Sequence, residues 1–109
     1  MEIVKQYGEF NKAEIFNLMQ GNGVLLKNVD EGAIIDIDRL VIIRDDSKDT
    51  PKDIMHVQTV DGNIYSTESP TVQATILSAI DFMETHKLKF SLYRQQSKAG
   101  RTFMNVKLI

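Results

Sequence analysis

A basic segment near the end of the chain is the first group of residues whose chemistry points to a ligand. RQQSKAGR, residues 94–101, contains three cations (Arg94, Lys98 and Arg101) and no acidic residue. Guanidinium and ammonium groups bind phosphate oxygens through charge-assisted hydrogen bonds. Gly100 can adopt the positive φ that a chain reversal requires, so the same segment would also suit a solvated hairpin tip. Taken alone, the segment leaves both interpretations open.

Two alternating segments flank this basic tip and predict the strands of a hairpin, Leu88–Gln95 and Thr102–Leu108. Their core face is predicted to hold the apolar positions Leu88, Phe90, Leu92, Met104, Val106 and Leu108. The opposite face then carries two aromatic rings framed by cations and an amide: Lys89, Tyr93, Phe103, Asn105 and Lys107. Nucleobases stack on such rings for about 1–3 kcal/mol each, while cations follow the phosphate backbone. The hairpin is therefore predicted to bind a single-stranded nucleic acid.

The aromatic residues also have a structural interpretation. Tyr and Phe at outward strand positions form cross-strand pairs that only stabilise a hairpin, and Phe103 could instead be covered by a short N-terminal helix. Tyr65, on a more central segment, could extend the stacking surface or pack into the core. We keep Tyr65 as a candidate contact, together with the tip cations Arg94, Lys98 and Arg101.

Charge is distributed unevenly along the 109 residues. The net charge of −2 by itself argues against a general polyanion binder. Residues 85–109, however, contain six Lys and Arg and no Asp or Glu, whereas the first 84 residues hold all 15 acids and the other seven cations. This asymmetry favours a polyanionic partner for the C-terminal segment. The alternative is a solvated hairpin whose cations pair with acids elsewhere in the fold.

Two helices are predicted among the elements that must position the hairpin. The first covers about residues 12–20, because Asn11 and Glu14 form a capping-box pattern before a short apolar face. The second runs from about Pro70 to Thr85, with Ser69 as its cap and apolar residues at helical spacing. Because the first helix is too short to stand alone, it must dock onto another element.

The segments between the two helices are predicted to be strands. Ala33–Arg44 is dense in β-branched residues, and its length predicts strong curvature or a bulge near Asp36–Asp38. Val24–Leu26 is expected as a short extended segment, and the other strands are Ile54–Val60 and Asn63–Thr67. The last two flank Asp61-Gly62, a pair favoured in two-residue hairpin turns.

Three strands, a helix and two strands, in this order, are typical of an OB-fold, a partly open barrel that often binds oligonucleotides. The sequence thus predicts a mainly β chain with two helices (α+β): an OB-fold-like five-stranded barrel over about residues 24–109 with an additional N-terminal helix. A small α+β sandwich would have the same element order. Residues 1–109 are expected to form a single domain, because this length suits one modest core and no linker or repeat is visible.

Several functional classes lack support in the sequence. Cysteine is absent, which excludes disulfides, thiolate catalysis and cysteine-ligated metals. Since no phosphate loop, dinucleotide fingerprint or nucleophile elbow is present, no enzymatic activity and no cofactor or metal are expected; a metal-dependent enzyme built on Asp36 and Asp38 is disfavoured for the same reason. No apolar run approaches the roughly 20 residues of a membrane-spanning helix, and no signal peptide is visible. A cytoplasmic protein without membrane contact is therefore expected.

Two segments carry a likeness to a known family. The residues that carry the resemblance are DGNIYSTESPT (residues 61–71), the apolar helix that follows, and SKAGRTFMNVKLI (residues 97–109). In these residues the chain resembles small single-stranded DNA-binding proteins of tailed bacteriophages of Gram-positive hosts. The likeness runs from about Ala33 to the C-terminus and is most particular at Ser97–Phe103. It implies an OB-like fold and binding of single-stranded DNA without sequence preference, in replication or recombination in the host cytoplasm. Many such proteins end in an acidic tail that recruits partners, whereas this chain ends in NVKLI, so recruitment through this end is not expected.

The sequence therefore predicts a non-catalytic single-stranded DNA-binding protein, with replication or recombination proteins as further partners. The alternative is a phage-encoded protein-interaction module, such as an inhibitor of a host or defence protein, whose acidic first 84 residues form the working surface. Oligomeric state stays open, although the edge strands of so small a barrel are compatible with a homodimer.

Overall fold

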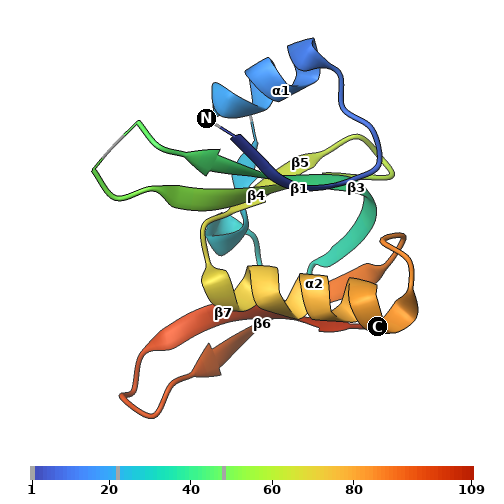
Figure 1. Cartoon of the computed structure of the whole chain (residues 1–109). Helices are drawn as coiled ribbons and strands as arrows, with labels where there is room; N and C mark the ends of the chain where they lie inside the picture. The colour runs from blue at the N-terminus through green and yellow to red at the C-terminus, as the bar shows by residue number, and fades with distance from the viewer. Residues whose placement is uncertain (1, 22, 48) are drawn as a thin grey trace.

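The computed structural model describes residues 2–21, 23–47 and 49–109 (Figure 1). Within them, seven strands join in one curled sheet, accompanied by two α-helices and a short 3-10 helix. In chain order the elements are β1 (Glu2–Tyr7), α1 (Lys12–Met19), β2 (Val24–Leu25), the 3-10 helix η1 (Leu26–Asn28), β3 (Ile34–Asp45), β4 (Lys52–Thr59), β5 (Ile64–Thr67), α2 (Pro70–Met83), β6 (Lys89–Gln96) and β7 (Thr102–Leu108).

The longest strand, β3, bends the sheet into a half-barrel. Its first residues, Ile34–Asp36, pair antiparallel with β6, whereas residues 37–45 pair antiparallel with β4. The β3–β4 register shifts between Ile37 and Arg39, which leaves Asp38 as an extra residue on β3. The expected irregularity near residues 36–38 is thus confirmed. The strands follow the order β2-β5-β4-β3-β6-β7, and β1 pairs with β3 outside this series.

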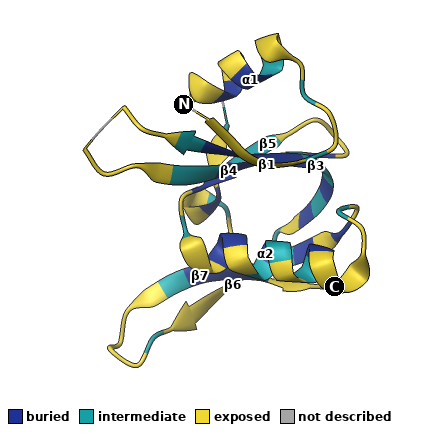
Figure 2. Cartoon of the chain, in the orientation of Figure 1, coloured by how far each residue is buried: buried dark blue, intermediate teal, exposed yellow. Residues whose placement is uncertain are grey.

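Helix α2 fills the interior of the curled sheet. Ser69 caps its start, where the Ser69 hydroxyl accepts a hydrogen bond from the Val72 N–H at 3.2 Å. Val72, Ile76 and Ile80 are buried in the same core as Phe90 and other inward residues of β3, β4, β6 and β7. Each such burial contributes about 1.5–3 kcal/mol. The helix therefore lies between the β4–β5 part of the sheet and the β6–β7 hairpin (Figures 1 and 2).

Helix α1 packs on the opposite, outer side of β3. Its capping box is formed as the sequence indicates: the Asn11 side chain accepts from the Glu14 N–H at 2.8 Å, and the Glu14 carboxylate accepts from the Asn11 N–H at 2.9 Å. Its buried residues, Ile15 and Leu18, belong to a second apolar cluster with residues of β3. Arg39 of β3 also pairs with Glu14. This docking accounts for the order of so short a helix.

Strand β1 is the element that the sequence pattern does not indicate. Residues 2–6 are all exposed, so no alternation marks them as a strand. Their order comes from antiparallel pairing with β3, in which Glu2 lies opposite Arg44 and Tyr7 lies opposite Leu40. With β1 and the two-residue β2, which pairs in parallel with β5, the sheet exceeds the five expected strands. Among the described residues, no helix has the length and apolar character needed to cross a bilayer.

Candidate nucleic-acid interface

The β6–β7 hairpin has most of the core face that its sequence predicts, although Leu108, expected on that face, is 40% exposed. Phe90, Leu92, Met104 and Val106 point inward and are buried in the core. On the other side the pairing register places Tyr93 opposite Asn105, Gln95 opposite Phe103 and Ser91 opposite Lys107. The far end of the hairpin projects past the start of α2, where its residues become exposed (Figures 1 and 2).

The outer hairpin face, defined here as Lys89, Tyr93, Phe103 and Lys107, combines rings with ammonium groups. Both lysines are exposed, and both rings are half-buried. Helix α1 does not cover Phe103, because the helix packs against the outer side of β3. Beside this face, β3 adds Ile34, whose side chain is 61% exposed. The aromatic side chains are therefore accessible, though neither stands free of the sheet.

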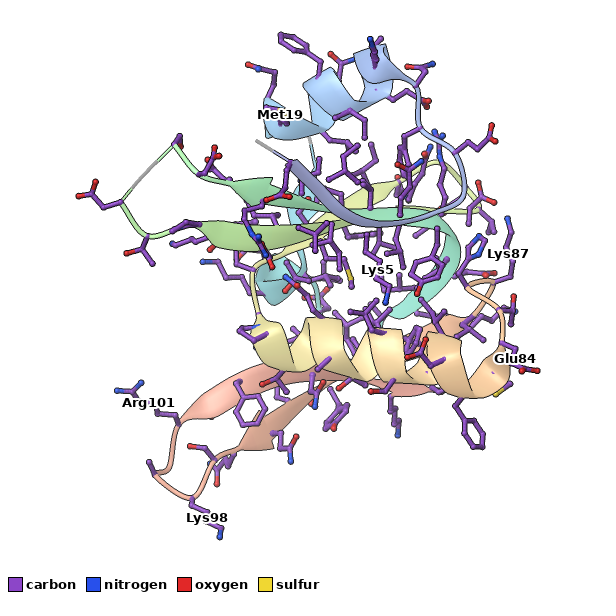
Figure 3. The ribbon with its side chains drawn as sticks, in the orientation of Figure 1. Lys5, Met19, Glu84, Lys87, Lys98 and Arg101 are labelled. Atoms are coloured by element: carbon purple, nitrogen blue, oxygen red, sulfur yellow. The ribbon has the colours of Figure 1, made fainter. Side chains whose placement is uncertain are left out.

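The hairpin tip is a tight, hydrogen-bonded turn that carries cations. The Ser97 N–H donates to the Arg101 carbonyl at 2.8 Å, and the Gly100 N–H donates to the Ser97 carbonyl at 3.0 Å. Gly100 has φ +80°, as the turn requires. Lys98 and Arg101 point away from the rest of the molecule (Figure 3). Among the described residues, neither of them nor Arg94 forms an ion pair.

Acidic residues do pair with the cations at the other end of the hairpin. Lys87 bonds to Asp38, and this hydrogen bond holds the pKa of the Asp38 carboxyl below its ordinary value. Lys89 Nζ lies 3.9 Å from Asp36 Oδ2, a long and solvent-exposed pair. The interpretation of a solvated hairpin neutralised by acids elsewhere therefore holds for Lys87 and Lys89 and not for the cations of the tip.

Asn105 corrects one expectation for the open face. Its side chain is only 9% exposed, and its amide oxygen accepts bonds from the Val106 N–H at 2.8 Å and the Thr75 hydroxyl at 3.2 Å. The reason is that β7 is an edge strand of the sheet and α2 packs along it, so the Asn105 side chain lies against Thr75 of the helix. Asn105 joins hairpin to helix and is not part of an open surface.

Tyr65 lies apart from the hairpin. It belongs to β5, which pairs with β4 and β2 and not with β7. Its half-buried ring packs against the main core, as the structural interpretation of this residue expected. The structure therefore does not unite Tyr65 with the outer hairpin face.

A cavity of about 270 Å³ opens beside the hairpin and contains a cation that the sequence did not single out. We call it the hairpin pocket; it is lined by Leu26, Lys27, Thr67, Ser69, Val72, Arg94, Thr102, Phe103 and Met104. Lys27 comes from η1, and it reaches the hairpin only because η1 packs beside β5. A single lysine in a three-residue helix carries no sequence signal, which explains why it was missed.

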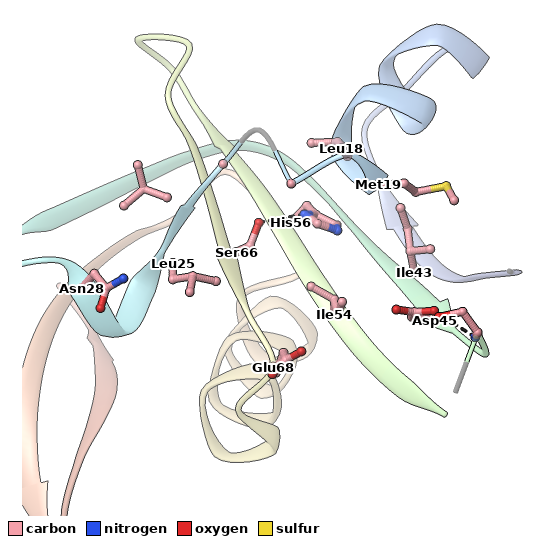
Figure 4. A pocket seen from close by; sticks show the side chains of 14 residues that line it. Leu18, Met19, Leu25, Asn28, Ile43, Asp45, Ile54, His56, Ser66 and Glu68 are labelled. Carbon is pink, nitrogen blue, oxygen red and sulfur yellow. Dashed lines mark hydrogen bonds between the residues drawn. The ribbon is translucent and has the colours of Figure 1, made fainter. Parts of the chain in front are cut away.

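A larger cavity, of about 730 Å³, lies on the outer side of β4 and β5 next to α1 (Figure 4). We call it the β4–β5 pocket. His56 Nδ1 and Ser66 Oγ form a hydrogen-bonding pair 2.8 Å apart in it, and burial lowers the pKa of His56 below its ordinary 6.5, so the ring is neutral. Among the described residues that line it, the carboxylates are those of Asp45 and Glu68, and none is a Lys or Arg.

Comparison with known proteins points to one family. A family model described as "Phage Single-stranded DNA-binding protein" matches residues 8–109. The single-stranded DNA-binding protein of Bacillus phage phi29 is 30% identical over 103 residues, which cover 87% of this chain and 82% of that protein. The corresponding protein of Bacillus phage PZA is 29% identical over 102 residues, with the same coverage. No solved structure matches. The likeness expected from the sequence is confirmed.

Proposed function

Because the chain belongs to the phage single-stranded DNA-binding protein family, we propose that it binds single-stranded DNA through the outer hairpin face and the tip of β6–β7. One observation carries this assignment of the site. Two accessible rings, Tyr93 and Phe103, lie on a projecting hairpin whose tip cations have no acidic partner among the described residues. Rings and unpaired cations close together on one hairpin are what a flexible polyanion with stacking bases requires.

The outer hairpin face binds bases by stacking. Tyr93 and Phe103 lie on adjacent strands and offer ring surfaces, and every base has a π-face, so the contact is indifferent to sequence. Lys107 is exposed beside them, and Lys89 is held only by a long pair with Asp36 that is open to solvent. A pair of this kind contributes little, so Lys89 can exchange Asp36 for a phosphate at small cost.

The tip binds the backbone. Arg94, Lys98 and Arg101 would each neutralise one phosphate and release its counterions. For single strands the logarithm of the binding constant falls with the logarithm of salt concentration by about 0.7 per phosphate, so three contacts give a slope of roughly −2. Asn105 and Tyr65 are not needed for this mode of binding.

The fold supports the same assignment. Strands β3 to β7, with α2 between β5 and β6, have the element order of an OB-like barrel. In this view the whole chain is one domain, and β1, α1 and β2 are additions to the barrel. The protein would cover single strands exposed during phage replication or recombination in the host cytoplasm, without catalysing a reaction.

A fluorescence-anisotropy titration tests the function. Labelled oligo-dT, a mixed-sequence oligonucleotide and a duplex of equal length are titrated at several salt concentrations. We expect similar affinities for the two single strands, weaker binding to the duplex, and a salt slope of about −2 from the tip, made steeper by any phosphate that Lys89 binds. Absence of single-strand binding at the lowest salt concentration would overturn the proposal. Replacing Arg94, Lys98 and Arg101 together by Gln should reduce the magnitude of the slope by about 2, the part that these three contacts contribute; an unchanged slope would move the phosphate contacts elsewhere.

A further inference from the structure

We propose that the hairpin pocket is a nucleotide subsite in which Lys27 and Arg94 together hold one phosphate of the bound strand. The proposal rests on the proposed single-stranded DNA binding and adds to it a site away from the outer hairpin face. The two cations lie 67 positions apart in sequence and meet only because η1, the start of α2 and the hairpin converge on one cavity.

The charges around the cavity select an anion. Lys27 and Arg94 are its only charged lining residues, and neither side chain forms an ion pair within the described part of the chain. Glu31, nearby, accepts the Arg94 backbone N–H at 2.7 Å, which fixes the strand and leaves the guanidinium unbonded. The β4–β5 pocket is larger, but the described residues that line it contribute the carboxylates of Asp45 and Glu68, which disfavour a phosphate.

Hydroxyl groups in the same lining can complete the binding of phosphate oxygens. Ser69 Oγ accepts from the Val72 N–H at 3.2 Å, and Thr67 Oγ1 accepts from the Ser69 N–H at 3.1 Å. A hydroxyl that accepts a backbone bond still has its own hydrogen to donate. Thr102 adds a third hydroxyl, from β7. These donors supplement the cations and would be ordered before DNA arrives.

The size and floor of the cavity fit one nucleotide. Its volume of about 270 Å³ is just below the roughly 300–1,000 Å³ typical of pockets for drug-sized ligands. Leu26, Val72 and Met104 form an apolar floor that belongs to the main core. The floor suits an uncharged base or sugar, and the cations suit the phosphate attached to it.

Phe103 connects this subsite with the outer hairpin face. It lines the hairpin pocket and also belongs to that face, opposite Gln95. A strand whose base stacks on Phe103 would therefore carry its next phosphate toward Arg94 and Lys27. Bound DNA would cross β7 near Thr102 and Phe103 and would not run only along the tip.

Substituting Lys27 tests the subsite. Anisotropy titrations with labelled oligo-dT compare wild type with Lys27→Gln and, as a control, with Lys12→Gln, an exposed lysine of α1 on the other side of the sheet. We expect Lys27→Gln to weaken binding several-fold and to reduce the salt slope by no more than the roughly 0.7 of one phosphate contact, because Arg94 still holds the shared phosphate, with Lys12→Gln close to wild type. Equal behaviour of the two variants, with wild type still binding, would overturn the subsite alone. Failure of wild type to bind would instead overturn the proposed function.

A double-mutant cycle tests whether the two cations share a phosphate. If they do, Lys27→Gln in the Arg94→Gln background should cost less affinity than it does in wild type, because the phosphate has already lost one partner. Strictly additive losses would show that the cations bind different phosphates and would contradict the shared site. Circular dichroism of each variant checks that these exposed substitutions leave the fold intact.

Discussion

Replacing Tyr93 by Ala is the most direct test of base stacking on the outer hairpin face. Tyr93 is half-buried on β6 opposite Asn105, and its hydroxyl donates to Gln95 Oε1 at 3.3 Å in an exposed, weak bond. The ring is not among the residues of the main core. Its removal should therefore affect a ligand on this face far more than the fold.

The two effects differ in size. Loss of one stacked base costs about 1–3 kcal/mol, which corresponds to a roughly 5- to 150-fold rise in Kd, since 1.4 kcal/mol is tenfold. Loss of the cross-strand contact with Asn105 costs only about 0.2–1 kcal/mol of folding free energy. The Tyr93→Ala variant should thus remain folded at room temperature while its affinity for oligo-dT falls at least several-fold.

The assay is an anisotropy titration at fixed salt concentration, with thermal melts followed by circular dichroism. The matched control is Tyr93→Phe, which keeps the ring and removes the hydroxyl bond to Gln95, and which should bind within about twofold of wild type. The salt slope should stay unchanged in both variants, because no phosphate contact is lost. If Tyr93→Ala is folded and binds as well as wild type, stacking on this face is refuted.

Two further predictions concern stability. Burial lowers the pKa of His56 below 6.5, so the stability that depends on the neutral ring is complete above pH 6.5 and is lost as pH falls through the lowered folded-state pKa. The melting temperature should therefore drop below pH 6.5, and the part of this drop that His56 causes should be absent in His56→Gln. A parallel drop in both proteins would contradict this assignment. Gly8 and Gly100 both have positive φ, at +82° and +80°, so Ala at either position should cost about 1–2 kcal/mol. A Cβ at Gly8 would also lie 2.6 Å from Arg39 Cβ, whereas at Gly100 it meets open space, so thermal melts should show the larger loss for Gly8→Ala, and equal losses would refute the steric argument.

Strong local patterns made much of the fold predictable. The two capped helix starts, at Asn11 and Ser69, depend on side chains and backbone groups three residues apart, and both form as expected. Alternation in β6 and β7 fixed which residues point inward, because one face of that hairpin must be buried. β1 could not be predicted in this way, since its side chains are exposed on both faces and it is ordered by pairing with β3.

The features of the candidate site likewise divide into those that the sequence predicts and those that depend on tertiary packing. Sequence by itself determined that the C-terminal segment is basic, that it reverses at Gly100, and that Tyr93 and Phe103 share a side of the hairpin, because these follow from composition and a period of two residues. Tertiary structure alone decided that Asn105 is taken up by Thr75, and that Lys27 joins Arg94 at one cavity. Those outcomes depend on which elements that are distant in sequence pack together, and such packing produces no periodic pattern of residue types in the sequence.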